Sequence, residues 1–141
     1  MVITIVGLLF LHFVADFLLQ SREMGKKKSQ EFHWLLQHLI IQFMIVYLGG
    51  CFLMDPRIAF RLSLLNAAIH GIIDWNIWRL YKLNVHYRIK KDAAQYGNPQ
   101  EAYDLKVKGW QYWEDHYFYA TIGLDQGLHS ITLVLLAGWL T

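Results

Sequence analysis

Three apolar stretches of the sequence each carry a histidine and an aspartate four residues apart, and this spacing constrains the fold more than any other feature. Residues four apart share one face of an α-helix, so each stretch predicts an apolar helix with a polar stripe. Every aspartate inside an apolar stretch has such a partner, whereas about 0.7 pairs would arise by chance from this composition. A shared role is therefore favoured, and the pairs are His12 with Asp16, His70 with Asp74, and Asp125 with His129.

Composition indicates a small integral membrane protein. Of the 141 residues, 55% are hydrophobic and only 17% are charged, and the charged residues gather outside four long apolar stretches. These stretches have the length of membrane spans, and the first lacks the basic leader and cleavage site of a secretory signal, so we expect it to be retained. We predict an all-α fold, a four-helix transmembrane bundle forming a single domain over residues 1–141, with spans at about 2–20, 33–54, 58–80 and 117–140.

The basic residues predict the orientation of this bundle. The connection after the first span is rich in lysine, and residues 81–116 interleave bases with tyrosines and tryptophans. Basic loops remain cytoplasmic, and bases with aromatics gather at lipid headgroups, so we expect 81–116 to be a cytoplasmic, interfacial helical insertion between the third and fourth spans. Asn98 before Pro99 should begin a helix within it. Both termini are then expected on the non-cytoplasmic side.

Charge and cysteine content exclude other classes. The net charge of +2 is too small to argue for nucleic acid, so the lipid bilayer is the expected partner. The single cysteine, Cys51, cannot form an intramolecular disulfide, and it makes thiolate ligation of a metal a poor interpretation. Any metal ligands should therefore be nitrogen and oxygen atoms.

Histidine and carboxylate side chains that converge from several helices are the requirement for a metal site in a bundle core. With no sulfur ligand we expect one or two divalent ions, with zinc first and manganese and iron also open. The alternative is that each pair forms only an intrahelical hydrogen bond, which helps both groups tolerate an apolar surrounding. The candidate ligands are His12, Asp16, His38, His70, Asp74, Asp125 and His129.

Amide side chains accompany these ligands. Gln20, Asn66 and Gln126, with Gln42, are candidates for binding a phosphate or orienting the ligands. Plain interhelical hydrogen bonding is an equal alternative for them. The run from Glu114 to His116 could add a ligand from above the site.

The chain resembles a family of uncharacterised small integral membrane proteins of bacteria and their phages. The resemblance rests on a His-x-x-x-Asp-Phe-x-x-Gln opening from His12 to Gln20 and an Asp-Gln-x-x-His ending from Asp125 to His129. Between them, His38 and the His70 motif also match. The motifs are similar in style to those of membrane-bound metal-dependent hydrolases, and more remotely to zinc phospholipase C and nuclease proteins. The resemblance implies a multi-pass protein of the bacterial inner membrane.

Three hypotheses for function follow. The first is a membrane-embedded metal-dependent hydrolase of a phosphoester or related bond in an amphiphilic, lipid-like substrate, with metal-bound water as nucleophile. Whichever of Asp16, Asp74 and Asp125 is not needed as a ligand would then be the catalytic base. The second is a non-enzymatic envelope protein with a structural metal, and the third is a pathway for protons or metal ions.

Overall fold

The computed structural model describes residues 2–141, and every regular element within that range is helical. The all-α prediction is therefore confirmed. The elements are α1 (Val2–Phe13), the π-helical turn η1 (Val14–Leu18), α2 (Arg22–Lys27), α3 (Phe32–Gly50), α4 (Pro56–Ala93), α5 (Pro99–Gly109), the 3-10 turn η2 (Tyr112–Glu114) and α6 (His116–Leu140).

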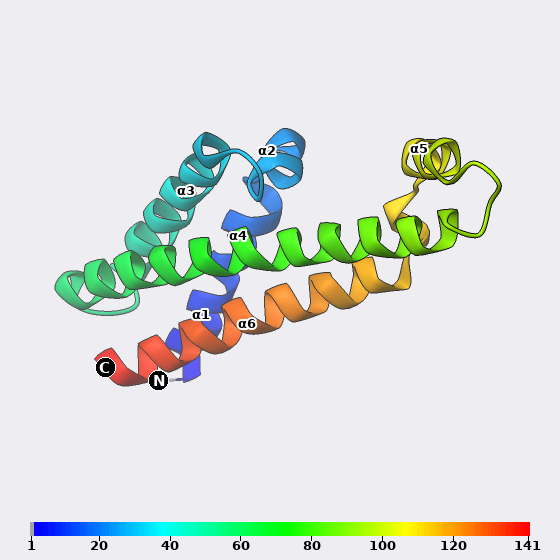
Figure 1. Ribbon diagram of the computed structural model, residues 1–141. Coiled ribbons are helices and arrows are strands. Elements are labelled where there is room, and N and C mark those ends of the chain that lie inside the picture. Colours follow the sequence, from blue (N-terminus) through cyan, green and yellow to red (C-terminus); the bar gives the residue numbers. More distant parts are fainter. Residues whose placement is uncertain (1) are drawn as a thin grey trace.

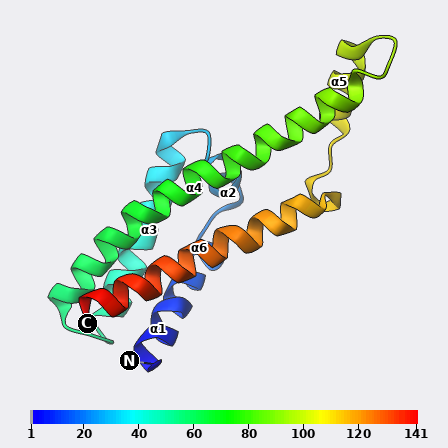
Figure 2. The same cartoon turned by 60° about the horizontal axis from the view of Figure 1, so that its bottom comes forward.

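Helices α1, α3, α4 and α6 form a bundle. Helix α3 packs on α4, α4 packs on α6, and α1 contacts both α3 and α6, which closes the ring. Figure 1 shows α4 and α6 side by side in opposite directions, with α5 at the far end of α4. In Figure 2 the first turn of α1, the last turn of α6 and the α3–α4 turn all lie at the other end of the bundle.

The helix boundaries follow from local sequence. The Ser21 side chain accepts a hydrogen bond from a backbone N–H in the first turn of α2. Asp55 does the same for α4, where Pro56 is the first residue. Asn98 caps α5 ahead of Pro99, as predicted. Each cap satisfies an N–H that has no partner within its helix, and proline needs none.

Two helices, α3 and α6, are long and apolar enough to cross a membrane by length and composition. The first apolar helix covers Val2–Leu18 and is shorter. Helix α4 has 38 residues, because it continues without a break past residue 80 to Ala93. The part beyond residue 80 contains the basic residues of the predicted insertion, so the second half of α4 is basic. Two of the four predicted spans, those in α3 and α6, are therefore long and apolar enough to cross a membrane.

Two apolar cores lie along the bundle. The first joins α1, α3, α4 and α6 near Leu62, and the second joins α4 to α5 and α6 near Tyr81. On α4, the stretch between these two residues carries His70 and Asp74. The polar stripe predicted from the sequence is therefore flanked by an apolar core on each side.

Candidate metal centre

All four bundle helices direct histidine or aspartate side chains into one buried cluster. No member is more than 3% exposed. Nitrogen-to-oxygen distances of 3.6 Å or less link the members into one continuous set. The structure thus brings together the seven residues proposed as ligands, which are His12 and Asp16 from α1 and η1, His38 from α3, His70 and Asp74 from α4, and Asp125 and His129 from α6.

Two histidine nitrogens and two carboxylate oxygens meet at the centre of the cluster. The Nε2 atoms of His38 and His70 are 2.9 Å apart. Asp16 Oδ1 lies 3.0 and 3.2 Å from these two nitrogens, and Asp74 Oδ2 lies 3.3 and 3.2 Å from them. In a tetrahedral zinc site with bonds of about 2.0–2.1 Å, neighbouring ligand atoms are about 3.3–3.4 Å apart. The distances from each carboxylate oxygen to the two nitrogens are therefore near those of a metal site, and His38, His70 and Asp74 are one of the groups that could hold an ion.

A glycine lies where α3 approaches α4. Gly71 follows His70 on α4 and faces Leu39, which follows His38 on α3. A Cβ at Gly71 would lie 2.8 Å from a terminal methyl carbon of Leu39, so a larger residue there would require the flexible Leu39 side chain to move. The glycine therefore gives the Leu39 side chain its present position beside the two histidines.

A second group of candidate ligands shares Asp74. Asp74, Asp125 and His129 could together hold an ion. His129 Nε2 is 3.4 Å from Asp125 Oδ1 and 3.6 Å from Asp74 Oδ1, and the His129 ring stacks on His70 with centroids 3.7 Å apart. Asp74 therefore faces His38 and His70 with Oδ2 and the second group with Oδ1.

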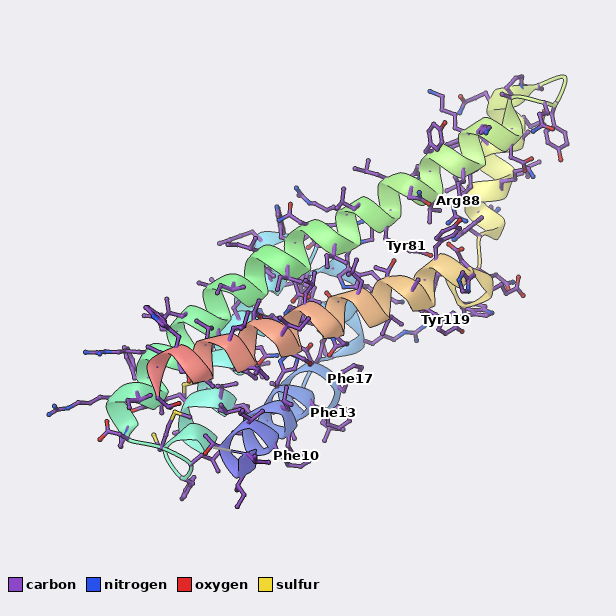
Figure 3. All side chains as sticks on the ribbon, turned by 90° about the horizontal axis from the view of Figure 1, so that it is seen from below. Phe10, Phe13, Phe17, Tyr81, Arg88 and Tyr119 are labelled. Atoms are coloured by element: carbon purple, nitrogen blue, oxygen red, sulfur yellow. The ribbon has the colours of Figure 1, made fainter. Side chains whose placement is uncertain are left out.

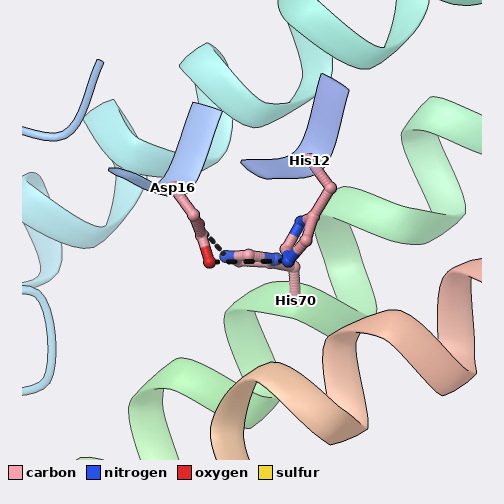
Figure 4. Close-up of side chains that lie close together, drawn as sticks. All are labelled: His12, Asp16 and His70. Atoms are coloured by element: carbon pink, nitrogen blue, oxygen red, sulfur yellow. Dashed lines mark ion pairs between the residues drawn. The ribbon is translucent and has the colours of Figure 1, made fainter. Parts of the chain in front are cut away.

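His12 and Asp16 lie where α1 widens into the π-helical turn. The backbone N–H of Leu19 donates to the carbonyl of Val14, five residues earlier. Figure 4 shows the His12 and Asp16 side chains converging on His70, and His12 Nε2 is 3.6 Å from Asp16 Oδ2. Single π-helical turns within α-helices occur frequently at functional sites. This turn places Asp16 deep in the bundle, and the helix ends two residues before the predicted boundary at residue 20.

Two glutamines hold Asp16 in place. The Gln42 amide donates to Asp16 Oδ1 at 2.7 Å and lies 3.2 Å from His12 Nδ1. The Gln126 amide donates to Asp16 Oδ2 at 3.0 Å and to Asp125 Oδ2 at 3.3 Å. Both therefore make the kind of contact that orients a ligating carboxylate.

The other two predicted amides differ from these. Asn66 is buried one turn before His70, and within residues 2–141 its Nδ2 has no hydrogen-bond partner. Gln20 lies beyond the end of η1, with its amide beside Gly25 of α2 rather than in the cluster. The early end of the first helix explains why Gln20 leaves the polar face.

Lys28 contacts the cluster, which the sequence pattern did not predict. Its Nζ lies 2.8 Å from Asp74 Oδ1 and 3.4 Å from His38 Nε2, and the side chain is 5% exposed. By its place in the sequence, Lys28 counts only as a loop charge. A usable signal was its spacing of four from Met24, the only large apolar residue between Ser21 and Glu31, because that spacing places Lys28 on the buried face of α2.

The turn that carries Lys28 is fixed to α4. Ser29 is buried, and its carbonyl accepts a hydrogen bond of 2.9 Å from Arg79. Its hydroxyl accepts one of 2.9 Å from Lys82. These two bonds from α4 hold the Lys28 ammonium against Asp74.

Comparison with known proteins identifies the family. Residues 4–141 match the family described as "Protein of unknown function (DUF3307)". The chain belongs to the DUF3307 family. No curated protein and no solved structure matched it. The matched range runs from the first turn of α1 to the end of the chain, so it contains the complete His/Asp cluster of this DUF3307 protein.

Charge gives a further constraint on the cluster of the DUF3307 protein. Three buried carboxylates and the Lys28 ammonium leave two negative charges when the histidines are neutral. Uncompensated buried charge is strongly destabilising. One divalent cation would neutralise the cluster, and the His/Asp groups could hold such an ion.

The predicted extra ligands between Glu114 and His116 lie outside this cluster. Asp115 instead begins α6 by accepting a bond from its backbone, and it pairs with Arg88 and Tyr81 of α4. Figure 3 shows both of these side chains projecting from α4 toward the start of α6. The hydrogen bonds from Arg88 hold the pKa of Asp115 below its ordinary value. Burial, with the Asp115 hydrogen bond, raises the pKa of Tyr81 to about 12.

Proposed function

We propose that this DUF3307 protein is a membrane-embedded, metal-dependent hydrolase that cleaves a phosphoester of an amphiphilic substrate. The observation that carries the proposal is the close set of two histidine nitrogens and two carboxylate oxygens, contributed by α3, α4 and the π-helical turn η1. Two nitrogen and two oxygen ligands without sulfur suit zinc, and manganese or iron would also accept them.

The distribution of polar and apolar side chains supports the membrane part of the proposal. Large apolar residues are exposed on the bundle helices, such as Ile40 at 54%, Leu135 at 65% and Trp139 at 75%. Figure 3 shows Phe10, Phe13 and Phe17 projecting outward from α1. The ionisable side chains of the His/Asp cluster are buried instead, as expected for ionisable groups at membrane depth. We assign the shorter α1 with η1, and the apolar first half of α4, as the other two spans.

The protein is proposed to lie in the inner membrane of a bacterium, with both termini on the non-cytoplasmic side, as loop charge predicts. An even number of spans puts both termini on one side, and Figure 2 shows the start of α1 and the end of α6 at the same end of the bundle. The lysine-rich α2 and the basic second half of α4 lie toward the other end, which is then cytoplasmic.

The residues of the chain have distinct roles in this proposal. Asp16, His38, His70 and Asp74 would hold one zinc ion, which would supply Lewis-acid stabilisation of a phosphoryl oxygen. Asp125 lies outside this set of four, so it is the base that removes a proton from the attacking water. The water oxygen bonds to phosphorus, the ester P–O bond breaks, and the proton passes to the leaving oxygen. Lys28 lies within reach of the same site and supplies a second positive charge.

The proposal is tested with the full chain purified in detergent. We expect one equivalent of zinc by elemental analysis, and zinc-dependent hydrolysis of bis(p-nitrophenyl) phosphate that EDTA abolishes. The His70→Ala variant should lose the metal, because it removes one of the four proposed ligands. The Asp125→Asn variant should keep the metal and lose about 100-fold or more in rate, because it removes only the base.

The His33→Ala variant is the matched control. His33 is exposed on the first turn of α3, and its only ion-pair partner within residues 2–141 is Glu31. This variant should retain both metal and activity. Wild-type protein that purifies without stoichiometric metal, and does not take up added zinc, would refute the metal centre and with it the hydrolase.

A structural metal site is the second candidate function. It is favoured by the closed character of the cluster, in which His38 and Asp74 are fully buried. Structural zinc sites are closed, whereas catalytic ones keep an open position. The two functions separate in the same experiment, because a structural site binds zinc and raises the melting temperature but leaves the phosphodiester intact in wild type.

A further inference from the structure

A cavity rich in basic and aromatic side chains lies between α2, α4 and the start of α6. Its volume of about 510 Å³ is within the range of small-molecule sites. Arg22, Lys26 and Lys82 line it, and Trp78 and Phe118 are among the aromatic rings that form its apolar wall. Among residues 2–141, no carboxylate lines it. We call it the basic cavity.

The cations of the basic cavity are not neutralised within the described chain. For Arg22, Lys26 and Lys82, no carboxylate of residues 2–141 lies within ion-pair distance. The nearby carboxylates on α2 and at the start of α3 pair with Lys27 instead. The Lys82 ammonium donates to the carbonyl of Lys26 and to the Ser29 hydroxyl, which leaves one of its three N–H groups for a ligand. Such a group of cations favours an anion.

The surroundings of the basic cavity favour an anion that carries an apolar chain. Leu80 and Leu83 of α4 lie within two residues of Lys82, outside the lining of the cavity, and they are 64% and 65% exposed. Trp78 and Phe118 are in contact within the second apolar core. Basic and aromatic side chains together occur where a membrane protein meets the headgroups of anionic lipids. A phosphate group with an acyl chain therefore fits the cations and aromatic wall of the cavity together with the exposed apolar surface near it.

The basic cavity is adjacent to the His/Asp cluster. Ser29 lines the cavity, and the preceding residue, Lys28, reaches Asp74 with its ammonium group. Trp78 follows Asp74 by one turn of α4, which is about 6 Å along the helix axis. A headgroup in the cavity is thus separated from the cluster by the Lys28 turn and one helical turn.

We propose that the basic cavity binds the headgroup of an anionic glycerophospholipid and presents its phosphate to the metal centre. The binding step stands on the cavity alone, whereas the presentation step rests on the proposed function. The statement therefore narrows the amphiphilic substrate to a phospholipid without a positive headgroup.

The test measures lipid binding in the absence of hydrolysis. Full-length protein in neutral detergent, treated with EDTA, is titrated with dioctanoyl phosphatidylglycerol, dioctanoyl phosphatidylcholine or inorganic phosphate, and the tryptophan fluorescence of the cavity is recorded. We expect phosphatidylglycerol to bind at least tenfold more tightly than phosphatidylcholine. The Arg22→Gln/Lys26→Gln double variant should weaken this binding about 30-fold. Each of the two cations near an anionic headgroup contributes about fivefold in affinity, and the two factors multiply.

The double variant is suited to this test because both side chains are exposed, and neither makes a side-chain hydrogen bond within residues 2–141. The matched control is Lys91→Gln/Lys108→Gln, which changes the net charge equally at exposed positions outside the cavity. Equal loss in both variants, equal binding of the two lipids, or a response to inorganic phosphate as strong as to phosphatidylglycerol would overturn the proposal. Failure of zinc binding or hydrolysis with the lipid result intact would instead remove only the presentation step.

Discussion

Replacement of Lys28 by methionine tests how the charge of the cluster is balanced. The Lys28 ammonium and Asp74 carboxylate are 2.8 Å apart, and their side chains are 5% and 0% exposed. Removal of one partner from a buried ion pair leaves the other charge uncompensated, at a cost of about 3 kcal/mol or more. For a chain of this length the melting temperature of the metal-free protein should then fall by roughly 10 °C. Zinc should reduce the difference, because the ion compensates the same carboxylate.

Tryptophan fluorescence during heating, with EDTA or with added zinc, measures both effects. The neighbouring Lys27→Met variant is the control, since the Lys27 side chain is 40% exposed and pairs with Glu23 and Glu31 at the surface. Surface pairs of this kind contribute about 0–1 kcal/mol, so the control should melt within a few degrees of wild type. If the metal-free Lys28→Met protein is as stable as the Lys27 variant, the Lys28 ammonium does not balance a buried charge and the reasoning is refuted.

Two further predictions concern the far end of α4 and the topology. The Asp115→Asn variant should have a lower melting temperature than wild type at pH 6. Arg88 lowers the pKa of Asp115 in the folded state, so the ionised carboxylate stabilises the fold above its ordinary pKa of 3.8. This stabilisation is lost as the pH falls toward the pKa of the folded state. The difference between wild type and variant should therefore shrink below about pH 4, and a constant difference would argue against the ion pair. In a Cys51→Ser background, cysteines introduced at Lys27 and Gln100 should resist an impermeant thiol reagent in intact cells, whereas one at Thr141 should react; the opposite pattern would show an inverted orientation.

Local sequence was sufficient to predict the long apolar helices and the shared faces of the His/Asp pairs, whereas α2 lies in a stretch that was expected to be a connection. Spacing by four defines a helix face, and capping residues such as Asn98 mark where a new helix begins, so these features need no tertiary information. The π-helical turn could not be predicted in this way. The turn depends on the contacts that Asp16 makes with His38 and Gln42, which lie on another helix. The predicted boundary at Gln20 failed for the same reason.

The number of ions is the part of the site that required the structure. Seven candidate ligands allow one or two ions, and the sequence left both open. The structure shows Asp74 Oδ2 facing His38 and His70, and Asp74 Oδ1 paired with the Lys28 ammonium. A second cation on Oδ1 would have to displace Lys28, whose turn is fixed by the bonds from Arg79 and Lys82 to Ser29. Since one divalent ion would already neutralise the cluster, the proposed function uses a single ion, and in that proposal Asp125 and His129 remain for proton transfer.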